Sequence, residues 1–263
     1  MALPDCGLVD VHAHLCDPVF DEDRHEVLAR ARDAGVTAII AVGEDMADAR
    51  RNLELSAEHS MVLPAAGLYP TRLDRDQAAD MRRFIRGHRD LLAAVGEVGL
   101  DYWVVKSESE KELQREIFRG FIELAAELDL PLNVHSRSAG RHVVALLLEG
   151  GASRVHLHAF DGNAASALPA VEAGYFFSVP PSVVRSEQKQ KLVKRLPLSC
   201  LLIETDSPVL GPAPPARNEP ANARIASHAV AELKGCSEKE VLEAAWHNTL
   251  RLYGETVARE RAG

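Results

Sequence analysis

The sequence is poor in several features on which whole classes of protein depend. Its four cysteines, Cys6, Cys16, Cys200 and Cys236, lie far apart and form no CxxC pair. They predict neither a zinc knuckle nor a disulfide framework, and reduced thiols are expected. No uninterrupted apolar run approaches the roughly 18 residues of a membrane span, and the segment MALPDCGLVDVHAHL lacks a signal-peptide pattern. We therefore expect a soluble intracellular protein of the cytoplasm or the nucleus, with no membrane partner.

Positive charge and aromatic side chains are also scarce. The 30 Lys and Arg residues are outnumbered by 39 Asp and Glu, which gives a formal net charge of −9. Proteins that hold nucleic acid over a broad surface are usually basic, because Lys and Arg neutralise the phosphates. Any nucleic-acid contact here must therefore be local. Because only 5% of the residues are aromatic, an extended base-stacking platform is not expected.

The chain does contain a repeated alternation of short apolar runs and amphipathic segments. The apolar runs lie at 8–15, 37–43, 62–69, 92–101, 131–137, 154–160, 175–180 and 201–207. Helical periodicity lies between them at 26–35, 111–129, 164–174 and 187–196, and a last helix is expected over 237–254. Eight such units predict an α/β fold, a (β/α)8 TIM barrel that forms one domain over 1–263. A doubly wound open sheet is the alternative, although no glycine-rich phosphate loop follows the first run.

Histidines and carboxylates lie where the expected strands end. In a TIM barrel these ends meet at one mouth. His12 and His14 are two residues apart, so both side chains point to the same side of their strand. The ends of other strands carry Glu97, His135, His158 and Asp206. Each residue alone has an ordinary explanation, such as a buried histidine or a capping aspartate, but these do not explain why all six lie at strand ends.

This set of residues predicts a site for two divalent metal ions. Imidazoles and carboxylates without thiolates suit Mg, Mn, Fe or Zn. Six ligands exceed one tetrahedral site, whereas two ions that share a bridging carboxylate would use all of them. Such a pair of ions favours an anionic substrate. Asp10 and Glu204, each two residues before a ligand, are expected to support the site from beneath.

Six ordered motifs resemble those of the TatD-type metal-dependent deoxyribonucleases, and they resemble a eukaryotic branch of that family most. They are VDVHAHL (9–15), VGEVGLDY (95–102), LPLNVHSR (130–137), HLHAFDG (156–162), ETDSP (204–208) and RNEP (217–220). The resemblance runs essentially end to end and implies a TIM-barrel hydrolase with two metal ions. By motif, one ion would be held by His12, His14, Glu97 and Asp206, and the other by Glu97, His135 and His158. The resemblance also implies a DNA substrate. The family acts on DNA as a 3′-exonuclease and, in related members, as an endonuclease at abasic sites.

The chemistry of the residues agrees with this resemblance. Phosphodiester hydrolysis needs a hydroxide at neutral pH, which a metal ion can activate, and positive charge at the phosphoryl oxygens. Glu97 and Asp206 are the expected catalytic residues, with Asp206 as general base. A D-aminoacyl-tRNA deacylase, or another ester or amide hydrolase on the same two-metal site, is the alternative. A non-catalytic metal-binding protein is disfavoured because all six ligand positions are present.

Three further residues are expected to bind substrate. Arg137 lies two residues beyond a ligand and suits a phosphate, although a surface ion pair is the alternative. Tyr69 stands in GLYP, where the family usually has histidine; it can donate a hydrogen bond but cannot shuttle protons near neutral pH. Asn218 lies within the RNEP motif. No obligatory protein partner is expected.

Two groups of residues near these motifs have two interpretations each. A basic segment after the seventh run could steer a DNA strand or form an ordinary solvated helix face; it comprises Arg185, Lys189, Lys191, Lys194 and Arg195. Tyr102, Trp103 and Phe160 lie beside ligand motifs and could stack one or two terminal bases. Packing in the core is the equal alternative for these three.

Overall fold

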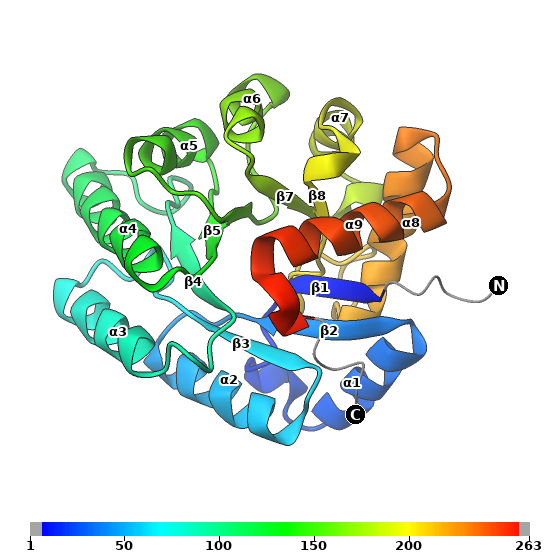
Figure 1. The fold of residues 1–263 in the computed structure, drawn as a ribbon, viewed down its shortest axis with the longest axis horizontal. Coiled ribbons are helices and arrows are strands. Elements are labelled where there is room, and N and C mark those ends of the chain that lie inside the picture. The colour runs from blue at the N-terminus through cyan, green and yellow to red at the C-terminus, as the bar shows by residue number, and fades with distance from the viewer. Residues whose placement is uncertain (1–6, 258–263) are drawn as a thin grey trace.

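The computed structural model describes residues 7–257, and it shows a barrel of eight parallel strands in sequential order inside a ring of helices (Figure 1). The strands are β1 (Leu8–Ala13), β2 (Val36–Ala41), β3 (Val62–Ala66), β4 (Ala94–Gly99), β5 (Leu132–His135), β6 (Val155–Leu157), β7 (Phe176–Val179) and β8 (Leu201–Ile203). Each strand overlaps one predicted apolar run, although β2 begins one residue before its run, so the predicted TIM barrel is confirmed. Cys6 and both ends of the predicted domain lie outside the described residues.

The helices follow the strands as β-α repeats require. They are α1 (Arg24–Asp33), α2 (Met46–Glu58), α3 (Arg75–Gly87), α4 (Glu108–Leu128), α5 (Gly140–Glu149), α6 (Ala164–Glu172), α7 (Glu187–Arg195), α8 (Ala223–Lys234) and α9 (Glu238–Tyr253). Short 3-10 helices include η2 (Pro181–Val184) and η4 (Pro220–Asn222). The capping box of Ser237 and Glu240 forms at the start of α9, which packs against β1 and β8.

The barrel closes between its first and last strands by backbone hydrogen bonds just beyond β8. The amide of Asp206 donates to the carbonyl of His12 over 2.8 Å, and the amide of His14 donates to the carbonyl of Ser207, also over 2.8 Å. The segment after β8 is therefore joined to β1. This seam brings the first and last of the predicted ligands together.

The inside of the barrel contains several buried polar side chains. All six residues of β1 and of β4 are buried, as both faces of a parallel sheet are covered. Yet several side chains with no exposed surface are polar: Asp10, His12, Asn133, His156 and Glu204. Buried polar groups are costly unless they are hydrogen-bonded or bind a ligand, so these side chains mark the part of the core that serves the site.

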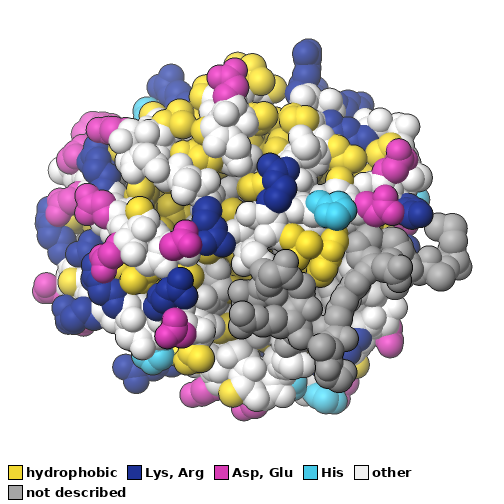
Figure 2. Space-filling view, in the orientation of Figure 1, with side chains coloured by type: hydrophobic (Ala, Val, Ile, Leu, Met, Phe, Trp, Pro, Cys, Tyr) yellow, Lys and Arg dark blue, Asp and Glu magenta, His cyan; other side chains and the backbone are white. Residues whose placement is uncertain are grey.

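The outer surface mixes charges of both signs. Figure 2 shows Lys and Arg side chains alternating with Asp and Glu at the left edge, over α3 and α4. Two of the ion pairs between these helices are Arg75 with Glu116 and Arg86 with Glu127, each at 2.6 Å. Within residues 7–257, no helix combines the length and the apolar character that crossing a bilayer requires.

Candidate metal centre

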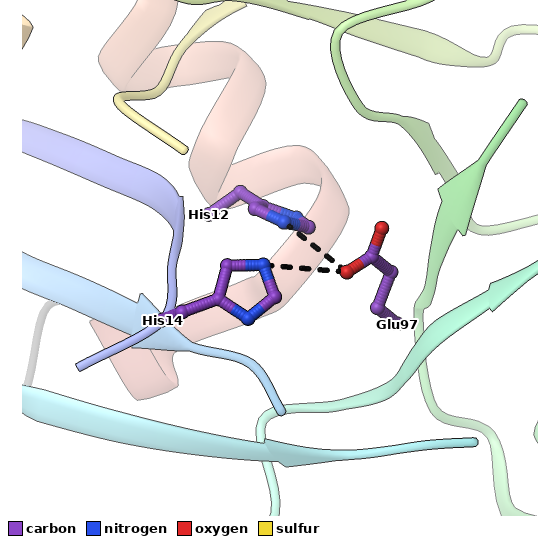
Figure 3. A group of neighbouring side chains, drawn as sticks. All are labelled: His12, His14 and Glu97. Carbon is purple, nitrogen blue, oxygen red and sulfur yellow. Dashed lines mark ion pairs between the residues drawn. The ribbon is translucent and has the colours of Figure 1, made fainter. Parts of the chain in front are cut away.

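The first group of side chains lies where β1 faces β4 across the barrel. His12 on β1 and His14 just beyond it both point toward Glu97 on β4 (Figure 3). Oε2 of Glu97 is 3.4 Å from Nε2 of His14 and 3.7 Å from Nε2 of His12. Oδ1 of Asp206 lies 3.4 Å from Nε2 of His12 and 3.5 Å from Nε2 of His14. Four of the six predicted ligands therefore converge on one point.

The second group shares Glu97 with the first. Its other oxygen, Oε1, is 2.7 Å from Nδ1 of His135 and 3.0 Å from Nε2 of His158. His135 ends β5, and His158 follows β6 directly. One carboxylate thus presents one oxygen to each pair of histidines, which is the arrangement expected of a carboxylate that bridges two ions.

The chemistry of these donors fits divalent cations. In His12, His14 and Glu97, and again in Glu97, His135 and His158, one ligand atom of each residue lies within 4.8 Å of the others. Among the described residues, Nε2 of His12 and Oε2 of Glu97 are buried without a hydrogen-bond partner. Leaving such atoms unpaired costs roughly 1–3 kcal/mol each. A cation between them would remove that penalty.

The ionisation of the group shows why it attracts positive charge. Burial alone would raise the pKa of Glu97, but the charge of His158 and the close contacts of its three histidine neighbours bring it well below its usual range. Burial alone would lower the pKa of His158, but Glu97 and Glu204 raise it to about 10. Glu97 and Glu204 therefore favour a proton on His158, and a metal ion would replace that proton.

Glu204 could complete a third group with His12 and His158, but its oxygens already have partners. Oε1 accepts a hydrogen bond from the amide of Ala159 over 2.9 Å, and Oε2 accepts one from the hydroxyl of Ser178 over 2.6 Å. Oε2 is also 3.6 Å from Nδ1 of His158. These contacts orient the histidine from behind, which agrees with the supporting role expected from the sequence.

Asp10 has a similar place beneath His12. Its carboxyl accepts hydrogen bonds from the amide of Thr205 over 2.8 Å and from the amide of His12 over 3.3 Å. These hydrogen bonds link β1 to the segment that carries Asp206. Burial raises the pKa of Asp10 to about 8.

Sequence reasoning missed two sets of supporting residues. Oδ1 of Asn133 on β5 accepts a hydrogen bond from Nδ1 of His12 over 2.9 Å. The sequence signalled this residue only by its position two residues before His135, which puts both on the same side of the strand. The second set forms a buried chain: the hydroxyl of Tyr253 is 2.8 Å from Nδ1 of His156, whose Nε2 is 2.5 Å from the hydroxyl of Ser178. Burial lowers the pKa of His156 well below its usual value, so its ring is neutral.

A cavity of about 560 Å³ opens beside the proposed metal ligands at the barrel mouth. Its lining includes Tyr69, His135, Arg137, His158, Lys189 and Asp206. The ring of Tyr69 meets that of His135 edge to face, with the centroids 5.1 Å apart. Burial, followed by the negative charges nearby, raises the pKa of the Tyr69 phenol, so it stays an O–H donor at neutral pH.

The other predicted contact residues divide between the cavity and the protein interior. Arg137 lines the cavity and is exposed. Asn218 is only 1% exposed, and its amide donates to the carbonyls of Thr205 and Val209 over 2.7 Å and 2.6 Å. These bonds hold the loop after β8, so the structure gives Asn218 a loop-supporting place. In the basic segment, Lys189 reaches the cavity, whereas Lys191 is exposed and pairs with Glu187.

Comparison with known proteins identifies the family of this chain. The sequence pattern of the TatD related DNase family matches residues 9–254. The chain belongs to this family. It is 47% identical to the mouse protein "Putative deoxyribonuclease TATDN3", with 94% of this chain and 88% of the relative covered. It is 45% identical to the human "Deoxyribonuclease TATDN3", with 94% of each covered.

More distant members of the TatD related DNase family agree. "Uncharacterized metal-dependent hydrolase YabD" of Bacillus subtilis is 34% identical, with 94% of this chain and 98% of the relative covered. The crystal structure of YJJV, a TatD homolog from Escherichia coli, superimposes with a TM-score of 0.87 at 27% identity, covering 94% of this chain and 98% of that one. The predicted TatD-type hydrolase with a TIM barrel is thus confirmed.

Proposed function

We propose that this protein is a divalent-metal-dependent deoxyribonuclease that hydrolyses DNA phosphodiesters, as a 3′-exonuclease and as an endonuclease at abasic sites, in DNA repair. The observation that carries the proposal is the position of Glu97, which offers one carboxylate oxygen to each of two histidine groups beside an open cavity. The relatives named deoxyribonuclease TATDN3 support DNA as the substrate.

The proposed ligands follow the two groups described above. His12, His14, Glu97 and Asp206 would hold one ion, and Glu97, His135 and His158 the other, with Mg, Mn or Zn as the candidates. When bound, such ions supply positive charge at the scissile phosphate and lower the pKa of a water molecule.

Side chains of the cavity would accept the proton and contact the phosphate. Asp206, whose pKa is lowered by its histidine neighbours against the effect of burial, is ionised and can accept a proton from the attacking water. Arg137 and Lys189 line the same cavity and would offset the negative charge of the phosphate. Tyr69 would donate its O–H to a phosphate oxygen.

The acidic composition fits this local mode of binding. With a formal net charge of −9, the chain would hold a strand end or a lesion at the cavity, and DNA affinity should depend on the bound metal. The unpaired thiols of Cys16, Cys200 and Cys236 support a reducing compartment, the cytoplasm or the nucleus.

The test compares three proteins on three substrates. Metal-loaded native protein, Glu97→Gln and the control His228→Gln, whose side chain is 66% exposed on α8, are incubated with single-stranded DNA, an abasic duplex and a D-aminoacyl-tRNA. We expect native protein and the control to cleave DNA and Glu97→Gln to be inactive. Deacylation with both DNAs intact would replace the nuclease by the alternative hydrolase, and equal cleavage by all three proteins would contradict the site.

A further inference from the structure

Trp103 is an unusually exposed aromatic residue at the barrel mouth. Its exposed fraction is 59%, and that of the adjacent Val104 is 53%. Tryptophan is normally highly buried because its large ring gains much from leaving water. Of the three aromatics singled out in the sequence, Phe160 is 1% exposed, and the Tyr102 hydroxyl accepts a hydrogen bond from Arg115. Of these three rings, only that of Trp103 is largely exposed to solvent, whereas Phe160 is buried and Tyr102 is hydrogen-bonded.

The loop that carries Trp103 is fixed to the metal centre. It follows β4, and Oδ2 of Asp101 lies 3.2 Å from Nε2 of His135. The amide of Tyr102 donates to the carbonyl of Arg137 over 2.9 Å. These two contacts hold residues 101–103 beside the end of β5, so Trp103 has a defined position next to the cavity.

Two cations lie against the ring. The guanidinium carbon of Arg137 is 5.3 Å from the ring centroid of Trp103, and Nζ of Lys106 is 5.5 Å from it. Arg137 also lines the cavity together with His135. Its guanidinium therefore connects the exposed ring with the proposed ligands, and it combines a charge for phosphate with a plane on which a base can lie.

We propose that Trp103 is a stacking site for a single nucleobase, that of the nucleotide next to the scissile phosphate, with Arg137 contacting that phosphate. This inference rests on the proposed deoxyribonuclease function. A nucleotide matches the patch because it offers a flat π surface and an adjacent negative charge, whereas the aliphatic side chain of a protein partner offers neither. Stacking tolerates every base, so the site selects unpaired nucleotides rather than a sequence.

The kinetic test uses Trp103→Ala and Trp103→Phe with single-stranded DNA as substrate. The loss of one base stack, about 1–3 kcal/mol, should raise KM about tenfold in Trp103→Ala while kcat changes less than twofold, and Trp103→Phe should restore most of the affinity. Leu91→Ala is the matched control, because Leu91 is 62% exposed but lies before β4, at the opposite end of the strand. Equal KM values for native protein and Trp103→Ala would overturn the proposal.

A fluorescence measurement separates this proposal from the activity itself. The chain has two tryptophans, so the signal of native protein minus that of Trp103→Phe reports Trp103. With metal-loaded protein, a thymidine tetranucleotide that carries cleavage-resistant phosphorothioate linkages should quench this difference signal, and the free sugar-phosphate deoxyribose 5-phosphate should not. Quenching without any DNA cleavage under metal-loaded conditions would retain the stacking site and reject the deoxyribonuclease. Cleavage without quenching would reject the stacking site alone.

Discussion

The side-chain oxygen of Asn133 accepts a hydrogen bond from the ring of His12, with 2.9 Å between Oδ1 and Nδ1. The orientation of the amide follows from its other contact, because Nδ2 of Asn133 donates to the carbonyl of Val11 over 3.1 Å. Nδ1 of His12 must therefore carry a proton, so Nε2, which faces Glu97 and Asp206, is the nitrogen that a metal ion would take. A residue of β5 thus sets the tautomer of a proposed ligand on β1.

Replacing Asn133 should weaken metal binding more than it weakens the fold. In Asn133→Ala the ring of His12 loses the partner that fixes its tautomer and orientation, and such losses cost about 10–100-fold in metal affinity. Calorimetric titration with Mn²⁺ would measure this. Asn52→Ala is the control, since Asn52 on α2 is equally buried; equal affinities for the two variants would contradict the role of Asn133.

The stability of the metal-free protein and its affinity for metal should respond to pH in opposite directions. The pKa of His158, raised from 6.5 to about 10, means that its proton stabilises the metal-free fold. That contribution is complete below about pH 6.5 and is lost as the pH rises toward 10. Metal binding must displace the same proton, so affinity should rise with pH, by about tenfold per unit for one proton.

Thermal melts in EDTA and Mn²⁺ titrations between pH 6.5 and 9.5 would reveal both trends. His158→Gln should flatten the pH dependence of the melts, whereas His228→Gln should leave it unchanged. A metal affinity that does not vary with pH would show that His158 is neutral before the ion binds.

Tyr69 should make the pH profile differ from that of a histidine at the same position. Because burial raises the pKa of its phenol, Tyr69 stays protonated throughout the working range. Tyr69→His should add an ionisation near pH 6–7 to the profile of kcat/KM. Tyr69→Phe should lower kcat/KM about tenfold through the loss of one hydrogen-bond donor. Superimposable profiles for native protein and Tyr69→His would place the ring outside the reaction.

The hydroxyl of Tyr253 should matter for stability. In Tyr253→Phe, Nδ1 of His156 loses its partner at 2.8 Å inside the barrel, which should cost about 1–3 kcal/mol. Denaturant unfolding in EDTA would measure the loss. Tyr175→Phe is the matched control, because its hydroxyl donates to the carbonyl of Ala152 in a partly exposed place, where water can replace it. A larger loss for Tyr175→Phe would contradict this reading of the buried chain.

The sequence was sufficient to predict the barrel and the six candidate ligands that meet in it. Strand periodicity of two put His12 and His14 on one side, and the shared mouth of a TIM barrel explains why Glu97, His135 and His158 join them. Local patterns carried this information because each ligand lies in or just after its own apolar run. Glu97 lies inside β4 rather than at its last residue, a shift that the apolar pattern was too coarse to show.

The supporting residues could not be read in the same way. Asn133 and His12 are 121 positions apart, and Tyr253 and His156 are 97 apart. Which buried polar side chains meet depends on packing across the barrel and not on any spacing within one segment. Asn218 shows the reverse case: its motif suggested substrate, while its contacts depend on how the loop after β8 folds back.

The closing seam of the barrel has a consequence for biosynthesis. His12 and Asp206 come from opposite ends of the sheet, and the hydrogen bonds that join their backbones also close the barrel. During translation, the proposed ligands His12 and His14 leave the ribosome long before Asp206 does. The proposed site therefore cannot form until residue 206 has been made, so fragments that end before Asp206 should lack metal-dependent activity.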